Sequence, residues 1–449
     1  MSNILIKNAT IINENSTKFR DILIENNIIK RIDNNIEAND SYEIIDCQNK
    51  LVIPGVIDDQ VHFREPGATN KATISSESIA AVLGGTTSFM DMPNNNPPAT
   101  TKESLKIKNE IACRNSLANY SFYLGATDSN LNEILELNPK ETCGVKIFMG
   151  SSTGDLLVDQ DEALEKIFRN TQLPITTHCE DNAIIAKNTK KFIEQYGEEN
   201  LTSSMHYLIR SRGACFESTK KAVELAVKTN ANLHVLHLST KEELELFKPF
   251  AKQPISQRRI SAEVCAHHLF FNNSYYEKLG NKLKCNPAVK EESDRAALVE
   301  AVRTGVITNI ATDHAPHTNE EKMLPYFKAP SGLPLIQYSL LAVLELVHKN
   351  ELTIENAVTA LCHNTALRFN VSKRGFIREG YFADIVIIDP NKKHTVIPAD
   401  IASKCKWSPF LGYTFNNSVD TTIVNGNIIV KDGKLLNQSV FGKALEFDR

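Results

Sequence analysis

Hydrophobic and polar residues alternate at both ends of the chain, in short runs rich in β-branched side chains. Near the N-terminus these runs cover residues 4–12, 21–24 and 28–32, and Asn-rich turns separate them. The same pattern returns at 383–390 and 422–430. β-Branched runs bounded by turn residues are typical of strands. We therefore predict one small β-sandwich domain built from both termini, and two separate β extensions are the alternative.

The middle of the chain alternates between apolar runs and helical patterns. Eight runs are predicted strands: 56–63, 86–92, 119–125, 144–149, 174–179, 232–238, 260–266 and 309–312. Helical patterns separate most of them, at 71–83, 102–115, 161–169 and 218–228. This alternation favours an α/β fold, a (β/α)₈ TIM barrel with its chemistry at the C-terminal strand ends. The expected domains are the N-terminal part of the β-domain at 1–53, the barrel at 54–372 and the C-terminal part of the β-domain at 373–449.

Composition narrows the classes of function. The chain has 449 residues, of which 42% are hydrophobic, so a globular protein is expected rather than a disordered one. Its 50 basic and 54 acidic residues give a net charge of −4 without a long basic run. This balance argues against nucleic-acid binding, and a small-molecule substrate is the expected partner.

The pattern also bears on location. The first residues enter a strand pattern without the architecture of a signal peptide. The longest apolar stretch, 333–347, is interrupted by Gln337 and Glu345, which predicts an amphipathic helix rather than a membrane span. Nine cysteines without a C-x-x-C pair indicate a reducing compartment. We expect a cytoplasmic protein, and a homodimer because that state is common among enzymes.

Polar side chains lie at or just beyond the ends of five predicted strands. A single histidine at a strand end is usually a packed or surface residue. Three histidines and an aspartate from four strands, all on one face, indicate instead a site for Zn²⁺ or a similar divalent metal. These four residues are His62, His178, His237 and Asp313.

Lys146 lies inside an apolar strand pattern, where burial lowers the pKa of an amine. In one interpretation its ammonium group reaches solvent at the strand end. In the other, the neutral amine reacts with CO₂, and the resulting carbamate bridges two metal ions.

Five motifs together resemble the dihydroorotases of the amidohydrolase superfamily. They are H-x-R-E-P-G at 62–67, D-M-P-N at 91–94, G-V-K-I-F at 144–148, I-A-T-D-H-A-P-H at 310–317 and A-D-I-V at 383–386. The first and fourth are fairly specific to dihydroorotases. The lysine strand and the A-D-I-V strand are shared with hydantoinases and allantoinases. The resemblance covers nearly the whole chain, including the divided β-domain.

The resemblance implies a role for each matching residue. It implies metal-dependent, reversible cyclisation of N-carbamoyl-L-aspartate to L-dihydroorotate in pyrimidine biosynthesis, with Asp313 as the general base and then the general acid. Two pairs would hold the metals, with carboxylated Lys146 between them: His62 with Asp313, and His178 with His237. The substrate carboxylate would contact Arg64, Asn94 and His317. Asn286 would lie beside the ring, and 318–332 would be a loop near the site.

One position departs from the resemblance. The family has H-x-H on the first strand, and Gln60 stands where the first histidine is expected. An amide oxygen is a poorer Zn²⁺ ligand than an imidazole, so one or two metals per chain are possible. Asp58 and Asp59 are neighbouring carboxylates, and Asp58 is expected to be structural.

Two other functions stay open. One is a cyclic amidase of the hydantoinase or allantoinase kind, which needs Arg64 and His317 less. The other is a catalytically silent paralogue acting as a partner subunit, which Gln60 alone favours. His267 and His268, after the seventh strand, are expected to pack or to form hydrogen bonds, and no metal role is assigned to them.

Overall fold

The first and last strands of the chain share one sheet. In this computed structural model the described residues are 3–150, 156–158, 160–436, 438–439 and 441–449. Within them the sheet runs in the order β20-β19-β18-β15-β5-β1-β2-β3, and β4 also pairs with β1. Its strands are β1 (Asn3–Asn13), β2 (Ser16–Glu25), β3 (Ile28–Asp33), β4 (Tyr42–Asp46), β5 (Leu51–Pro54), β15 (Ile385–Asp389), β18 (Ser418–Val424), β19 (Asn427–Lys431) and β20 (Lys434–Leu435). The alternative of two separate β extensions is therefore wrong, because β5 and β15 pair along their length.

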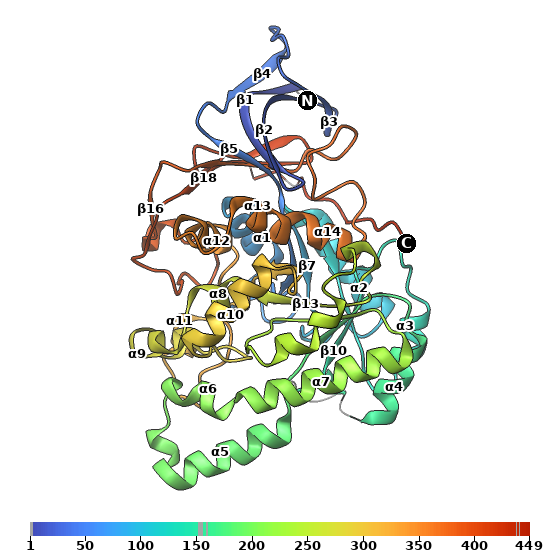
Figure 1. Ribbon diagram of the computed structural model, residues 1–449, viewed down its shortest axis with the longest axis vertical. Coiled ribbons are helices and arrows are strands. Elements are labelled where there is room, and N and C mark those ends of the chain that lie inside the picture. The colour runs from blue at the N-terminus through green and yellow to red at the C-terminus, as the bar shows by residue number, and fades with distance from the viewer. Residues whose placement is uncertain (1–2, 151–155, 159, 437, 440) are drawn as a thin grey trace.

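The middle of the chain forms parallel strands flanked by helices (Figure 1). One described sheet has the order β6-β7-β8, and a second has the order β14-β13-β12-β11-β10-β9. The strands are β6 (Val56–Val61), β7 (Thr86–Asp91), β8 (Asn119–Phe122), β9 (Leu124–Gly125), β10 (Val145–Phe148), β11 (Ile175–His178), β12 (Leu233–Val235), β13 (Ile260–Cys265) and β14 (Asn309–Ala311). Each lies within a predicted strand.

The two parallel sheets are connected at both sides. Only Tyr123 separates β8 from β9. On the other side, Val61 forms a parallel bridge with His314, and the backbone N–H of His62 donates to the carbonyl of His314 over 2.7 Å. The segment after β14 therefore lies beside the end of β6, so residues from the first and last parallel strands meet.

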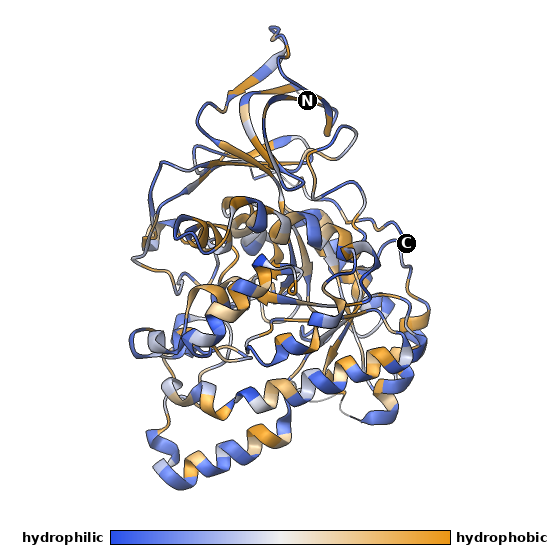
Figure 2. Cartoon of the chain, in the orientation of Figure 1, coloured by the Kyte–Doolittle hydropathy of each residue, from blue (hydrophilic) through white to orange (hydrophobic). Residues whose placement is uncertain are grey.

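Helices cover the outside of these strands. Their bounds are α1 (Ile74–Leu83), α2 (Lys102–Asn115), α3 (Leu131–Leu135), α4 (Asp161–Asn170), α5 (Asn182–Tyr196), α6 (His206–Ile209), α7 (Arg212–Thr229), α8 (Ala266–Phe270), α9 (Tyr276–Leu279), α10 (Glu292–Arg303), α11 (Asn319–Lys322), α12 (Ser339–His348), α13 (Ile354–Val358) and α14 (Asn364–Phe369). In α7 the buried positions recur every three or four residues, from Ala214 to Ala226, and the helix is striped in Figure 2. This is the spacing of a helix that buries one face.

The prediction for residues 333–347 is partly wrong. The helix begins only at Ser339, because the backbone N–H groups of Leu335 and Ile336 bond to the ring of His314 instead. Nor is α12 amphipathic, since all of its residues from Ser339 to Leu346 are buried. Glu345 is accommodated inside by hydrogen bonds from Asn416. Among the described residues, no helix is long and apolar enough to cross a membrane.

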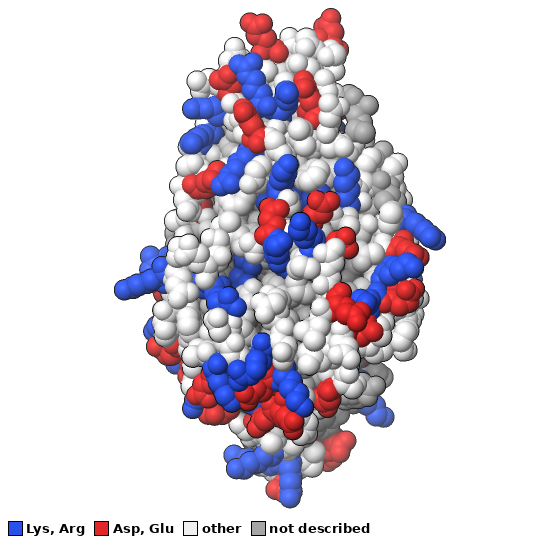
Figure 3. All heavy atoms as spheres, turned by 90° about the vertical axis from the view of Figure 1, so that its right-hand side faces the viewer, with Lys and Arg blue, Asp and Glu red and all other residues white. Residues whose placement is uncertain are grey.

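Both signs of charge mix on the surface. Lys and Arg side chains lie among Asp and Glu side chains over the face shown in Figure 3. Many form pairs between neighbouring turns of a helix, such as Lys166 with Glu162 on α4. Neither sign of charge dominates this face.

Candidate active site

All the residues predicted to carry chemistry line one pocket of about 240 Å³. It opens where the parallel strands end, as the sequence predicts for an α/β fold of this kind. Its lining consists of Gln60, His62, Arg64, Asn94, Lys146, Phe148, His178, His237, Asn286, Asp313, Ala315, His317, Ser331 and Gly332. Residues from at least six strands therefore converge on one space.

The first pair of candidate ligands comes from β6 and β14. His62 Nε2 lies 3.0 Å from Asp313 Oδ1. The other ring nitrogen, Nδ1, lies 2.6 Å from Asn94 Oδ1. Because a carbonyl oxygen only accepts, Nδ1 carries the proton and Nε2 faces the carboxylate. A bare nitrogen and a carboxylate oxygen at this distance repel unless a proton or a cation lies between them.

The second pair comes from β11 and β12. His178 Nδ1 and His237 Nε2 are 3.0 Å apart. Glu180 Oε2 lies 2.8 Å from His178 Nε2, and Arg210 Nε donates to the same carboxylate. Arg210 lowers the pKa of Glu180 against the opposing effect of burial, so Glu180 is an anion that accepts the Nε2 proton. A partner of this kind leaves the inner nitrogen of a histidine free to bind a metal.

Lys146 lies on β10 with 1% of its surface exposed. Among the described residues, no hydrogen bond or ion pair reaches its Nζ, which lies 4.6 Å from the centre of the Phe148 ring. Burial lowers the pKa of Lys146 to about 7. A large fraction of this amine is therefore neutral near pH 7, and a neutral amine is nucleophilic.

Three residues of the pocket have a left-handed backbone. The φ angles are 68° at Arg64, 39° at His237 and 50° at Asp313. This conformation is uncommon for residues other than glycine, and it costs of order 1–3 kcal/mol. Such strain persists where the surrounding structure fixes it, and it concentrates at functional sites.

Gln60 lines the pocket with 1% of its surface exposed. Its Nε2 donates to Asp313 Oδ1 over 3.2 Å, and its Oε1 lies 3.8 Å from Cys265 Sγ. Neither neighbouring aspartate takes over the place of a metal ligand. Asp58 accepts from Thr312 Oγ1, and Asp59 accepts from Asn309 Nδ2.

Arg64 also lines the pocket and is half-buried. It donates from Nε to the carbonyl of Pro316 over 3.1 Å, and its Nη2 lies 3.1 Å from His317 Nε2. Desolvation lowers the pKa of Arg64. The guanidinium stays charged because the pKa of a free arginine exceeds 12, so it favours an anion in the pocket.

Sequence reasoning assigned no function to His206, although it supports a pocket residue. His206 Nε2 lies 3.1 Å from Asn286 Oδ1 and 2.8 Å from the carbonyl of Cys285, and its Nδ1 lies 2.8 Å from the Tyr326 hydroxyl. The ring is buried, and burial lowers its pKa to about 3, so the ring is neutral. It joins Asn286 to the segment 318–332.

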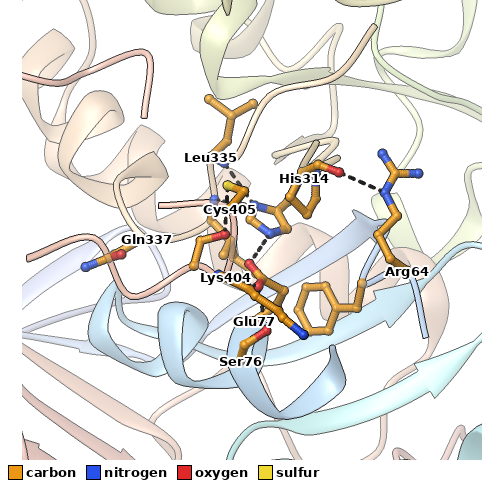
Figure 4. Close-up of polar contacts among 12 residues, drawn as sticks. Arg64, Ser76, Glu77, His314, Leu335, Gln337, Lys404 and Cys405 are labelled. Atoms are coloured by element: carbon orange, nitrogen blue, oxygen red, sulfur yellow. Dashed lines mark hydrogen bonds and ion pairs between the residues drawn. The ribbon is translucent and has the colours of Figure 1, made fainter. Parts of the chain in front are cut away.

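His314, next to Asp313, ties the pocket to the rest of the molecule (Figure 4). Its Nδ1 accepts from the backbone N–H groups of Leu335 and Ile336, so its Nε2 carries the proton and lies 2.8 Å from Glu77 Oε2. Glu77 in turn accepts from the backbone N–H of Lys404. The strained backbone at Asp313 is thus held by α1 and by the C-terminal segment.

The segment 318–332 is held closed by two buried lysines. Lys322 donates to the carbonyls of Lys284, Pro330 and Gly332. Lys284 donates to the carbonyls of Tyr326 and Ala329. Ser331 and Gly332, at the end of this segment, line the pocket, in agreement with the expected loop near the site.

Two compact clusters of ligand-type side chains occur among the described residues, and neither is the predicted set. They are Asp59 with His234 and Glu263, and Cys265 with His267 and His268. In the first cluster, burial and Asp59 raise the pKa of Glu263. The two carboxylates flank the ring of His234, whose Nε2 lies 3.4 Å from Asp59 Oδ2 and 3.1 Å from Glu263 Oε2. In the second cluster, the rings of His267 and His268 are tilted by 38° with their centres 4.0 Å apart.

Comparison with known proteins identifies the family. The amidohydrolase family matches residues 51–429. A protein of Methanosphaera stadtmanae named dihydroorotase is 33% identical over 434 residues, 96% of this chain and 97% of that protein. A dihydroorotase of Clostridium acetobutylicum is 33% identical over 442 residues, 96% of this chain and 100% of that protein. The solved structure of an L-hydantoinase from Arthrobacter aurescens has a TM-score of 0.93 at 25% identity, over 99% of this chain and all of that one. The chain therefore belongs to the amidohydrolase family, and its resemblance to the dihydroorotases is confirmed along nearly its whole length.

Proposed function

We propose that this protein is a dihydroorotase, which interconverts N-carbamoyl-L-aspartate and L-dihydroorotate. The observation that carries the proposal is the pocket itself. It brings together two pairs of ligand atoms, His62 with Asp313 and His178 with His237, and the guanidinium of Arg64. The relatives named dihydroorotase support it over nearly the full chain.

The proposed architecture is a closed (β/α)₈ TIM barrel at 54–372 with a small β-sandwich domain at 1–53 and 373–449. The order of the parallel strands and the bridge between Val61 and His314 support closure of the barrel. The sheet that pairs β5 with β15 supports a β-domain built from both termini. A cytoplasmic homodimer remains a prediction.

The proposed cofactor is Zn²⁺, held by His62, Lys146, His178, His237 and Asp313. The residues fit a divalent cation, since each pair has ligand atoms 3.0 Å apart and the outer nitrogens of His62 and His178 have partners of their own. The buried Lys146 amine fits a carbamate, whose negative charge would match the cation. When bound, such a metal polarises a carbonyl and lowers the pKa of water to about 7.

Asp313 is the proposed general base and acid. Its carboxylate lies in the pocket between His62 and Gln60, where it can take a proton from the attacking water. It then delivers that proton to the ring nitrogen that leaves. A single carboxylate performs both steps because the proton it gains in the first is the one it loses in the second.

Arg64, Asn94 and His317 are proposed to hold the substrate carboxylate, and Asn286 to contact the ring. Arg64 offers planar N–H donors that match a carboxylate. The oxygen of the Asn94 amide is engaged by His62, which leaves its Nδ2 as the donor for an anion. His206 Nε2 contacts Asn286 Oδ1 and so supports that side chain.

A cyclic amidase of the hydantoinase kind is the second candidate, and the likeness to hydantoinase structures favours it. A D-hydantoinase from Thermus sp. has a TM-score of 0.87 at 27% identity over 98% of both chains. The test is turnover of L-dihydroorotate, hydantoin and dihydrouracil by the purified protein, together with its metal content. Turnover of dihydroorotate alone supports the proposal, turnover of only the uncharged rings supports the hydantoinase, and no turnover by metal-loaded protein supports a silent paralogue.

A further inference from the structure

Lys71 lies behind the His317 ring, on the side away from the pocket. Its Nζ is 3.1 Å from His317 Nδ1 and 2.8 Å from Glu321 Oε1. Glu321 belongs to α11, in the segment 318–332 that closes beside the pocket. Lys71 precedes α1 and is partly buried, with 20% of its side chain exposed. The cation therefore reaches a ring that itself lines the pocket.

These contacts determine which nitrogen of His317 carries the proton. Lys71 beside Nδ1 and Arg64 beside Nε2 both have donors and no acceptor, so the two cations alone do not select a tautomer. The carbonyl of Ser331 decides between them, because it is an acceptor 3.1 Å from Nε2. The single N–H of the neutral imidazole therefore belongs to Nε2, and Nδ1 accepts from Lys71.

The same tautomer leaves Arg64 available. Arg64 Nη2 lies 3.1 Å from His317 Nε2, and two donors cannot form a hydrogen bond with each other. Burial and the charges of Arg64, Lys71 and Lys322 lower the pKa of His317, so the ring is neutral. The Nε2–H of His317 then donates to Ser331, and Arg64 keeps its N–H donors for the pocket.

Without Lys71 the opposite tautomer has a ready partner. Glu321 Oε2 is 3.7 Å from His317 Nδ1 and can accept a proton there. Nε2 would then turn a lone pair toward the pocket, and Arg64 Nη2 would donate to it. An anion in the pocket would then compete with the ring for that Arg64 donor.

We propose that Lys71 is a positioning residue that holds His317 in the Nε2–H tautomer, so that the ring donates to Ser331 and leaves Arg64 free to donate to the carboxylate of the substrate. The identity of that substrate rests on the proposed function, whereas the tautomer does not. Glu321 is the counter-charge that fixes Lys71 and that competes for the ring when Lys71 is removed.

Nitrogen NMR of the full-length protein with ¹⁵N-labelled histidine rings tests the tautomer directly. The His317 signals are assigned by their loss in His317→Asn. The expected spectrum shows a bare Nδ1 in the wild type and a protonated Nδ1 in Lys71→Met. A protonated Nδ1 in the wild type, or the same tautomer in both proteins, overturns the proposal. This measurement needs no turnover, so it stands even where the dihydroorotase assignment fails.

Kinetics test the consequence for binding. Lys71→Met should raise KM for L-dihydroorotate by about tenfold or more, with a much smaller change in kcat, because a donor to a charged group is lost. KM for dihydrouracil, which lacks the carboxylate, should stay within about twofold by the same argument. Lys71→Arg keeps a cationic donor and should restore most of the affinity.

A matched variant separates the tautomer from simple loss of charge. Lys404→Met removes another cation whose contact lies close to Lys71 in the sequence, because Lys404 Nζ donates to the carbonyl of Thr69 and not to a histidine. It should leave KM unchanged. The double variant Lys71→Met with Glu321→Leu removes the competing acceptor and should bind better than Lys71→Met alone. The proposal is contradicted if KM rises as much in Lys404→Met as in Lys71→Met. It is also contradicted if KM rises as much in Lys71→Arg as in Lys71→Met.

Discussion

The side-chain amide of Gln60 donates to Asp313, with Nε2 and Oδ1 3.2 Å apart. Its oxygen is turned the other way, toward the thiol of Cys265. The group that faces the carboxylate is therefore an NH₂, which has no lone pair to offer a cation. Gln60 lies in the pocket where the resemblance expects a histidine ligand, but it acts there as a hydrogen-bond donor.

Gln60→His should strengthen metal binding at the pair formed by His62 and Asp313. An imidazole adds a nitrogen ligand where the amide offers none, so the metal affinity of that pair should rise by about tenfold or more. Metal titration of the two proteins by calorimetry measures the difference. Gln60→Asn, which keeps an amide, is the control. If Gln60→His and the wild type bind metal with the same affinity and stoichiometry, position 60 has no role in metal binding.

Asp313→Asn should abolish most of the activity. The amide keeps the shape of the side chain and removes the basic group, and loss of general acid–base catalysis costs about 10²-fold or more in kcat. The measurement is kcat for L-dihydroorotate, with thermal unfolding as a check that the fold is intact. Wild-type turnover in Asp313→Asn would rule out the assigned mechanism.

Arg64→Met should discriminate between substrates. Loss of one partner of a charge-assisted pair should reduce kcat/KM for dihydroorotate by about tenfold to 10²-fold. An uncharged cyclic imide should lose far less, because its binding does not use the guanidinium. The two values of kcat/KM are compared in the same preparation, and an equal loss on both substrates would favour the hydantoinase.

Lys146→Ala should contain less metal than the wild type. If the lysine is carboxylated, short carboxylic acids should partly restore both metal content and activity, because they supply the missing anion. Growth or refolding without bicarbonate should lower the metal content of the wild type, and added CO₂ should restore it. A fully metallated and active Lys146→Ala protein would mean that the lysine is an ordinary strand residue.

Lys146 should also make the stability of the metal-free protein depend on pH. Its pKa is lowered from 10.5 to about 7, so between these values the unfolded chain binds more protons than the folded one. Stability from this group is therefore complete above pH 10.5 and is lost as the pH falls toward 7. Without metal or bicarbonate, Lys146→Met should be more stable than the wild type by roughly 2 kcal/mol or more at pH 7, and the gap should shrink toward pH 10. Urea unfolding at both pH values measures it, and a gap that grows with pH would contradict the assigned direction.

Strands and helices followed from local pattern because each depends on which residues alternate over a few positions. The eight central apolar runs all contain the strands that the structure has. The error at 333–347 had a tertiary cause, since the start of that run is held by the ring of His314, a residue about twenty positions earlier. No periodicity in the run itself encodes that contact.

The candidate site divides in the same way. The sequence determined which side chains meet, because the ends of parallel strands lie on one face. His178 is the last residue of such a strand, and His62, His237 and Asp313 follow one. Only the tertiary structure decided the direction of the Gln60 amide, the support of Asn286 by His206 and the contact between Lys71 and His317. These are hydrogen bonds between atoms distant in sequence, and each depends on distances of about 3 Å that a spacing of residue types does not specify.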